Sequence, residues 1–270
     1  MIDPVAASSA SSRSSDVGHL VVAGQATGRP PHPMAGQLSN AVNITAPHKP
    51  QETAPSLLDP TGWEASLFLE LRPTHRLDLT WRDFSSSALT DAEASQLDIA
   101  EVEFLNFRNN RLTGFVQGPA TAGAIGINLS NNAVTTLAFP NSGLPRLCAL
   151  NISGNPLDAL PERCAEGMPH LVRLHAWQCG LVTLPEDFDR LTRLRAVNLS
   201  GNRLTSLPPL PPNLRELHLS GNAFHDIPSS LTGLHPGCHV YMNDNPLCSE
   251  AIAGWHARPG PKPILHVSTT

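Results

Sequence analysis

Histidine side chains are the residues of this sequence whose type and spacing come nearest to a reactive site. His175, His218 and His239 are expected on one face of a repeated fold, and three imidazoles could bind zinc if their nitrogens met within about 2.1 Å of one point. His175 is expected too far along that face for this. The sequence also has no zinc-type cysteine pairs, no phosphate-binding glycine loop and no nucleophile motif. We therefore predict no catalytic residue, no metal ion and no cofactor.

The five cysteines do not form the paired clusters that cap many extracellular repeat domains. This odd number favours a reducing compartment over a disulfide framework. Cys179 has two readings: a small buried thiol that replaces asparagine in a repeated turn, which we favour, or a reactive nucleophile.

The element that positions these residues is a repeat. The stretch Leu194 to Pro208 recurs almost unchanged as Leu214 to Pro228, with aliphatic residues at relative positions 1, 4, 6, 11 and 14. These positions cannot all face one side of a helix or of a long strand, but they can all point into a coil that packs only against its neighbours. This pattern is identified as a leucine-rich repeat.

The repeat predicts an α/β solenoid, a horseshoe of about eight coils with a parallel sheet on its concave side, over residues 74–247. A side-chain amide at position 9 can satisfy backbone groups where the chain leaves the strand, so a ladder of amides is expected. The position 4 residues are Leu77, Leu105, Ile127, Leu150, Leu174, Val197, Leu217 and Val240. The position 9 residues are Arg82, Asn110, Asn132, Asn155, Cys179, Asn202, Asn222 and Asn245.

The remaining segments flank the repeats. Residues 1–56 are rich in Ser, Ala, Pro and Gly and are expected to be disordered. Residues 57–73 are expected to form an N-terminal capping helix, in which Trp63 covers the core or, alternatively, binds a partner. A second helix is expected over Ser87 to Leu97, with a capping box at Thr90 and Glu93. Prolines such as Pro161 and Pro185 predict extended or 3₁₀ return arms, and residues 248–270 are expected to be a C-terminal cap.

The net charge argues against nucleic acid as a partner, and the hydrophobicity pattern argues against a membrane span. The formal net charge is −5, and there is no basic run or basic-aromatic stripe, so nucleic acid is not expected. No run of 18 apolar residues and no signal-peptide core occurs, so a membrane span is not expected.

Two stretches of the sequence resemble those of a known protein family. The repeats from Leu194 to Pro228, with their Leu-Pro-x-Leu-Pro-x-x-Leu link, resemble those of bacterial type III-secreted effectors of the YopM and IpaH kind. The segments from Asn245 to Ile252 and from Gly260 to Ile264 are similar to the cap that closes those repeat domains, and plant-pathogen effectors of the Xop type are also similar. Most coils here are longer than the family's 20 residues.

The resemblance implies a protein that is secreted by a bacterium and binds a host protein in the host cytoplasm or nucleus. Such a protein either acts alone or is the substrate-recognition part of a ubiquitin ligase, whose Cys-x-Asp motif Cys248-Ser-Glu250 does not reproduce. The alternatives are a structural or chaperone-binding role inside the bacterium and an enzyme with an unrecognised site. The sequence does not decide the oligomeric state.

Strand alternation places the binding surface. Positions 3, 5 and 7 point away from the buried leucines onto the concave sheet, where most side chains are small and polar. Trp and Arg most often dominate interface energies, so Trp177 is expected to anchor a partner or, alternatively, to cover the Cys179 coil. The candidate partner-binding residues are Arg173, His175, Trp177, Glu216, His218, His239, Tyr241, Phe104 and Arg108.

Overall fold

The computed structural model of the 270-residue chain describes residues 81–97, 99, 102–114, 121, 123–139 and 143–268. The expected N-terminal tail and the expected capping helix at residues 57–73 lie outside the described residues. Within the described part, no helix is long and apolar enough to cross a membrane.

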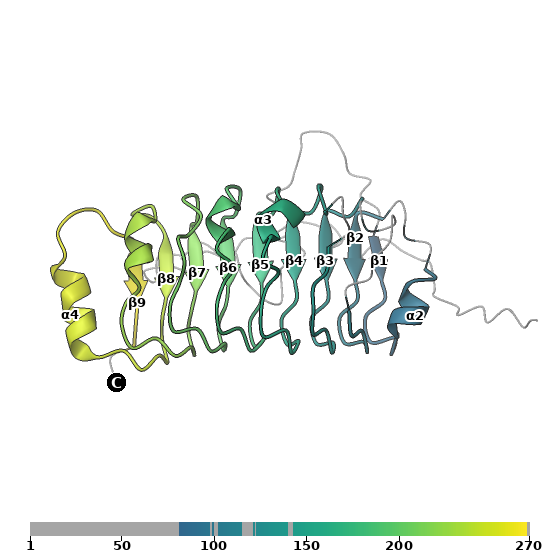
Figure 1. The fold of residues 1–270 in the computed structure, drawn as a ribbon, viewed down its shortest axis with the longest axis horizontal. Helices are drawn as coiled ribbons and strands as arrows, with labels where there is room; N and C mark the ends of the chain where they lie inside the picture. The colour runs from purple at the N-terminus through teal and green to yellow at the C-terminus, as the bar shows by residue number, and fades with distance from the viewer. Residues whose placement is uncertain are drawn as a thin grey trace, which may run out of the picture. The chain divides into compact units, whose positions relative to one another are not determined.

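The described residues form a single parallel sheet in which every strand pairs with the next one along the chain (Figure 1). The strands are β1 (Trp81–Asp83), β2 (Phe104–Asn106), β3 (Gly126–Asn128), β4 (Ala149–Asn151), β5 (Arg173–His175), β6 (Ala196–Asn198), β7 (Glu216–His218), β8 (His239–Tyr241) and β9 (Ile264–His266). The position 4 residues from Leu105 to Val240 face one another in this register. The predicted solenoid with a parallel sheet is confirmed. The sheet has a ninth strand because the C-terminal segment adds β9.

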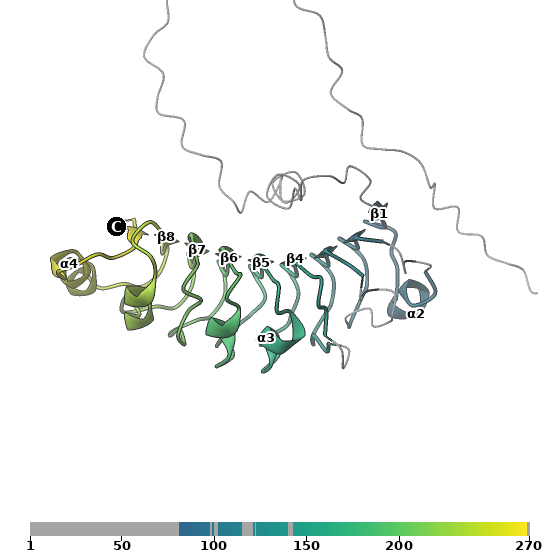
Figure 2. The ribbon, with the colours of Figure 1, turned by 90° about the horizontal axis from the view of Figure 1, so that it is seen from above.

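The core runs the length of the solenoid between the sheet and the return arms. The aliphatic residues of one coil illustrate how completely the core is buried: 0% of the surface is exposed in Leu194, Val197, Leu199 and Leu204. Figure 2 shows the strands along the concave side and the return arms, with the short helix α3, on the other side. Each coil buries its leucines only against neighbouring coils, which is why the pattern has to repeat.

Position 8 turns the chain out of each strand. Its residues have positive φ, from 53° to 68°, and are Ser86, Asn109, Asn131, Gly154, Gln178, Gly201, Gly221 and Asp244. Glycine and asparagine adopt this left-handed conformation at low cost, which explains the Ser-Gly-Asn motif at Gly201 and Gly221.

The amide ladder follows directly after this turn. Asn132 shows the pattern: its Nδ2 donates to Leu129 O in its own coil and to Phe107 O in the preceding coil, both at 2.9 Å. Its Oδ1 accepts from Leu112 N of the preceding coil at 3.0 Å. Asn110, Asn155, Asn202, Asn222 and Asn245 make equivalent bonds. One side chain per coil thus joins two coils and satisfies buried backbone groups.

Cys179 fills the ladder position of its coil by different contacts. Its thiol donates to Ile152 O of the preceding coil at 3.3 Å, but sulfur does not replace the accepting oxygen of an amide. The Cys179 carbonyl oxygen accepts from Leu157 N instead, at 3.1 Å. Asp158 and Gly180 adopt positive φ around this contact. The favoured interpretation, a buried thiol in place of asparagine, is therefore what the structure shows.

The expected register of the first coil was wrong. We expected Leu77 at position 4, with Asp78 at position 5 and Arg82 in the ladder, but Arg82 itself pairs with Leu105 and Asp83 pairs with Asn106. Asp83 also behaves as a position 5 residue, because its Oδ1 accepts from Ser85 N at 2.9 Å. The error arose because this strand has arginine where the other coils have an aliphatic residue.

The return arms are short and mostly extended, as the prolines predicted. Their regular elements are α2 (Asp91–Ala94), α3 (Cys164–Gly167) and the 3₁₀ helices η2 (Phe188–Arg190) and η3 (Ser229–Gly233). The capping box at Thr90 and Glu93 is present, but α2 has four residues and belongs to the return arm of the first coil. The expected helix over Ser87 to Leu97 was therefore too long.

The C-terminal segment closes the described end of the core. Helix α4 (Ser249–Ala257) buries Trp255, which is 4% exposed and belongs to the core cluster. Lys262 Nζ donates to the carbonyl oxygens of Trp255, His256 and Arg258 at 2.8 to 2.9 Å, so a cation satisfies the carboxyl end of α4. The chain then returns to the sheet as β9.

Candidate partner-binding surface

The asparagines at position 5 are occupied by their own backbone. In Asn106, Asn128, Asn151 and Asn198, Oδ1 accepts from the amide two residues later at 3.0 to 3.2 Å. These side chains therefore stabilise the end of each strand. The side chains that interrupt this row on the C-terminal strands are His175, His218, Tyr241 and His266.

The middle of the sheet carries Arg173, His175 and Trp177 on and directly after β5. Arg173 is 1% exposed and His175 is 2% exposed, whereas Trp177 is half-buried. Burial, and after it the neighbouring Arg173, lower the pKa of His175 to about 4, so the imidazole is neutral at physiological pH. Trp177 lines an open hollow of about 240 Å³ with Gln178, Asn198, Ser200 and Gly201. In this structure Trp177 is the residue of the three that a partner can reach directly.

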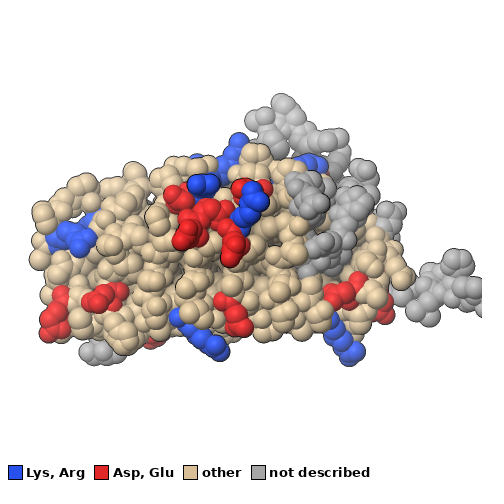
Figure 3. Space-filling view, viewed as in Figure 1, with Lys and Arg blue, Asp and Glu red and all other residues tan. Residues whose placement is uncertain are grey.

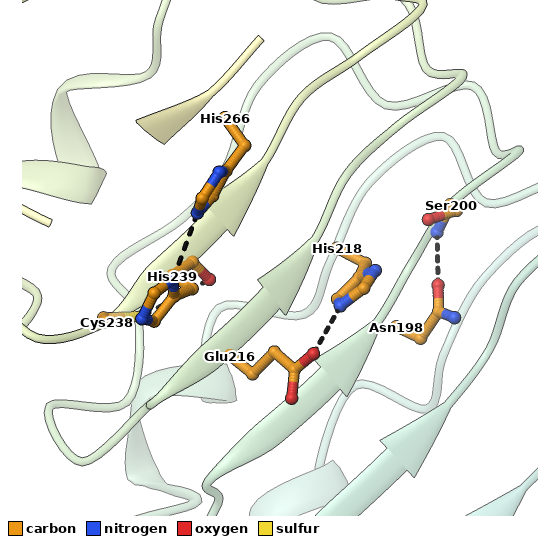
Figure 4. A network of polar contacts seen from close by, with 7 residues as sticks. All are labelled: Asn198, Ser200, Glu216, His218, Cys238, His239 and His266. Carbon is orange, nitrogen blue, oxygen red and sulfur yellow. Dashed lines mark hydrogen bonds and ion pairs between the residues drawn. The ribbon is translucent and has the colours of Figure 1, made fainter. Parts of the chain in front are cut away.

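A second group lies on β7, β8 and β9. The rings of His218, Tyr241 and His266 follow one another with centroids 4.4 Å apart at each step; Tyr241 and His266 are stacked, and His218 is tilted by 32° against Tyr241. His239 Nδ1 lies 3.0 Å from His266 Nε2, and His218 Nε2 lies 2.8 Å from Glu216 Oε1 (Figure 4). We call these five residues, Glu216, His218, His239, Tyr241 and His266, the ring patch.

The charges of the ring patch depend on its burial. Desolvation raises the pKa of Tyr241, and the Glu216 carboxylate raises it further. Desolvation lowers the pKa of His266, and the neighbouring His239 and His218 add to that shift. These pKa shifts keep Tyr241 protonated and His266 uncharged at neutral pH. Both side chains can then form hydrogen bonds at the edges of their rings.

The structure separates the candidate residues into groups. Phe104 lies on β2 and is 2% exposed, and Arg108 is exposed just after that strand. Two strands lie between β2 and β5, and one strand lies between β5 and β7. The candidates thus form three separate groups on one sheet.

Sequence reasoning missed His266 because β9 was expected to be part of a cap without a strand. The signal was present in Ile264-Leu265-His266, where an aliphatic residue alternates with two outward positions as in the other strands. Leu265 pairs with Val240 and packs partly buried against the core.

The three candidate histidines, His175, His218 and His239, have separate contacts. His218 contacts Glu216 and Tyr241, His239 contacts His266, and His175 lies two strands from β7 in the sheet order. In the described ranges, no group of three or more His, Cys, Asp or Glu residues could hold a metal ion.

The buried thiols are poor nucleophiles. Burial raises the pKa of Cys179 to about 11 and the pKa of Cys238 to about 12. For Cys164, burial and then the Asp187 carboxylate raise the pKa strongly. Because the thiolate is the reactive form, these three side chains act as small core residues.

Comparisons with known proteins agree with this architecture. The leucine-rich repeat family matches residues 213–234. No curated protein matches the sequence of this chain. The leucine-rich-repeat domain of a Shigella effector has a TM-score of 0.55 and 23% identity, over 69% of this chain and 80% of that domain.

Two YopM structures are also similar. YopM from Yersinia enterocolitica has a TM-score of 0.43 and 26% identity, over 54% of this chain and 34% of YopM. YopM from Yersinia pestis, described as a leucine-rich effector protein, has a TM-score of 0.43 and 25% identity, over 54% of this chain and 44% of YopM. The chain spans less than half of either YopM. The coils described above and the match at residues 213–234 show that the described part of the chain has the leucine-rich-repeat fold.

Proposed function

We propose that this chain is a protein-recognition solenoid that a bacterium secretes into a host cell, where it binds a host protein through the concave face of its sheet. The observation that carries the proposal is the presence of large side chains at outward positions of a sheet on which Asn106, Asn128, Asn151 and Asn198 are engaged with their own backbone. Such side chains are accessible at Trp177 beside its hollow, in the ring patch and at Arg108.

Similarity to known effectors supports the proposal that this chain is itself an effector. The Shigella domain comes from an effector, and the repeats from Leu194 to Pro228 resemble those of secreted effectors. Within this proposal the chain acts without catalysis of its own, either alone or as the substrate-recognition part of a ubiquitin ligase. Residues 1–56 then act as the secretion signal, and fusing them to a translocation reporter tests that role directly.

The binding surface is tested at Trp177. A partner is first captured from host lysate, and its affinity is then measured by calorimetry for the wild type and for Trp177→Ala. We expect a loss of about 2 kcal/mol or more in binding free energy, because a half-buried tryptophan beside a hollow is the typical form of an interface anchor.

Val182→Ala is the control, since Val182 is 48% exposed and lies outside the strands. Thermal melting should be nearly unchanged for both variants. A collapse of stability in Trp177→Ala would show that Trp177 covers the Cys179 coil. Unchanged binding would move the proposed contact away from β5, and the ring patch would be substituted next.

A further inference from the structure

Arginine side chains gather on a different part of the molecule, at the edge where the chain enters the strands. Arg195 and Arg215 directly precede β6 and β7, and the Arg215 amide donates to Arg195 O at 2.8 Å. The two arginines therefore occupy matched positions on adjacent coils. Arg193 precedes Arg195 by two residues, and Arg146 holds the same place before β4 that Arg193 holds before β6.

These guanidinium groups are largely uncompensated. Arg146 Nη2 pairs with Glu103 Oε1 at 3.0 Å, and the Arg146 side chain is 55% exposed. Among the residues that the structure describes, Arg193, Arg195 and Arg215 have no ion pair. Like charges at matched positions of neighbouring strands destabilise a sheet, so this row lowers the stability of the free protein.

Cys148 shows that the row spans the intervening coil. Burial raises the pKa of this thiol, and both Arg193 and Arg146 oppose that shift. Cys148 directly precedes β4, in the coil of Arg146, so the charge of Arg193 in the coil of β6 is felt across the intervening coil of β5. Figure 3 shows basic side chains near the upper border of the face seen in Figure 1, with a group of acidic side chains beside and below them.

We propose that this arginine edge, formed by Arg146, Arg193, Arg195 and Arg215, binds an acidic segment of a protein partner. From β4 to β7 the edge spans three strand spacings, about 14 Å, which an extended segment of roughly four residues covers. Arginine suits such a segment because its planar fork accepts a carboxylate through two hydrogen bonds.

The charge of the surroundings favours a peptide over a nucleic acid. The chain carries a net charge of −5, and Glu186, Asp187 and Asp189 lie in and beside η2, a few residues before Arg193. These carboxylates repel a long polyanion, whereas a short acidic segment can avoid them. The edge is distinct from the concave outward positions, so this proposal stands whether or not the concave face binds a partner.

The test uses the full chain and a fluorescent peptide of about eight residues rich in Asp and Glu. Fluorescence anisotropy should show binding that weakens as salt is added. The double variant Arg195→Glu/Arg215→Glu should weaken binding at least about tenfold, since two attractive contacts become repulsive. Melting curves by circular dichroism establish that the variant is folded.

The matched control is Arg111→Glu/Arg203→Glu, which changes the net charge equally at two exposed arginines away from the edge. It should change the affinity less than about twofold. An equal loss in this control would show that only net charge attracts the peptide. No binding of the peptide to the wild type, or tighter binding of a single-stranded RNA of equal charge, would also overturn the proposal.

Discussion

Single side chains at the turns decide how firmly the coils are joined. Asn202 is 7% exposed and accepts from the amides of Cys179 and Leu181 at 2.9 and 3.1 Å. Its Nδ2 donates to the carbonyl oxygens of Ala176 and Leu199 at 2.8 Å. No other residue type of this size both donates and accepts in this way, which explains why the ladder is nearly all asparagine.

We therefore expect Asn202→Ala to lower the free energy of unfolding by at least about 3 kcal/mol, because four buried backbone groups each lose a hydrogen bond and only Leu199 O keeps another, from Asn222 Nδ2. Urea unfolding followed by circular dichroism measures the change. Asn213→Ala is the control: Asn213 is exposed and makes one bond, to Thr192 O, so its loss should cost less than about 1 kcal/mol. Equal effects of the two substitutions would show that the ladder does not stabilise the fold.

The sequence could predict the ladder but not its exception. Spacing alone located Asn110 to Asn245, since a side-chain amide is needed wherever the chain leaves a strand. It could not show that the Cys179 carbonyl oxygen would accept from Leu157 N, because that contact depends on the positive φ of Asp158 and Gly180. The sequence also could not predict the burial of Arg173 and His175, since strand alternation gives the direction of a side chain but not its exposure.

The strands and return arms could be predicted wherever the leucine-rich repeat recurs in the sequence. The strands from β2 to β8 follow from the aliphatic spacing, and the prolines correctly predicted return arms without long helices. The two ends departed from this pattern: β1 has Arg82 at the register position, and β9 comes from a segment expected only to cap. Terminal coils pack on one side only, so their sequences are less constrained and carry a weaker signal.

Strand β9 has a side-chain contact to its neighbour that depends on pH. The bond from His239 Nδ1 to His266 Nε2 needs one ring to donate and the other to accept, which is impossible when both rings are protonated. The groups facing it are Tyr241 on β8 and Glu216 and His218 on β7. Desolvation, with His239 and His218, lowers the pKa of His266 in the docked strand.

Docking of β9 should therefore weaken in acid. Above the ordinary pKa of histidine both the docked and the undocked His266 are neutral, and the docking free energy is fully present. As the pH falls through that value, the undocked strand takes up a proton more readily, so docking loses free energy until the docked ring is protonated too.

Hydrogen exchange measures this effect. The amides of Ile264 and Met242, which join β8 and β9, should have lower protection factors at about pH 5 than at about pH 7. His266→Phe keeps an aromatic ring without a titrating proton and should remove most of this pH dependence. His225→Gln, at an exposed residue outside β8 and β9, should leave it unchanged. Equal protection at both pH values in the wild type would contradict the expectation.

At the scale of the whole molecule, each coil of the solenoid gains most of its stability from its two neighbours. The described core is one continuous cluster from Leu89 to Trp255 rather than a centre surrounded by shells. Such arrays behave as a sum of coil stabilities and nearest-neighbour contacts, and an end coil without a cover exposes its apolar side. The C-terminal segment provides that cover through Trp255 and through β9.

Deleting residues 248–270 should therefore loosen the chain from that end rather than everywhere. We expect faster hydrogen exchange first around β8 and β7, because Val240 loses its pairing with Leu265 and the Met242 amide loses its bond to His266 O, with little change around β4 and β5. Trp255→Ala in the full chain should give a weaker form of the same gradient, because it removes the buried side chain and leaves β9 in place. A uniform increase in exchange along the sheet would show that the coils unfold as one unit, and the nearest-neighbour description would then fail for this protein.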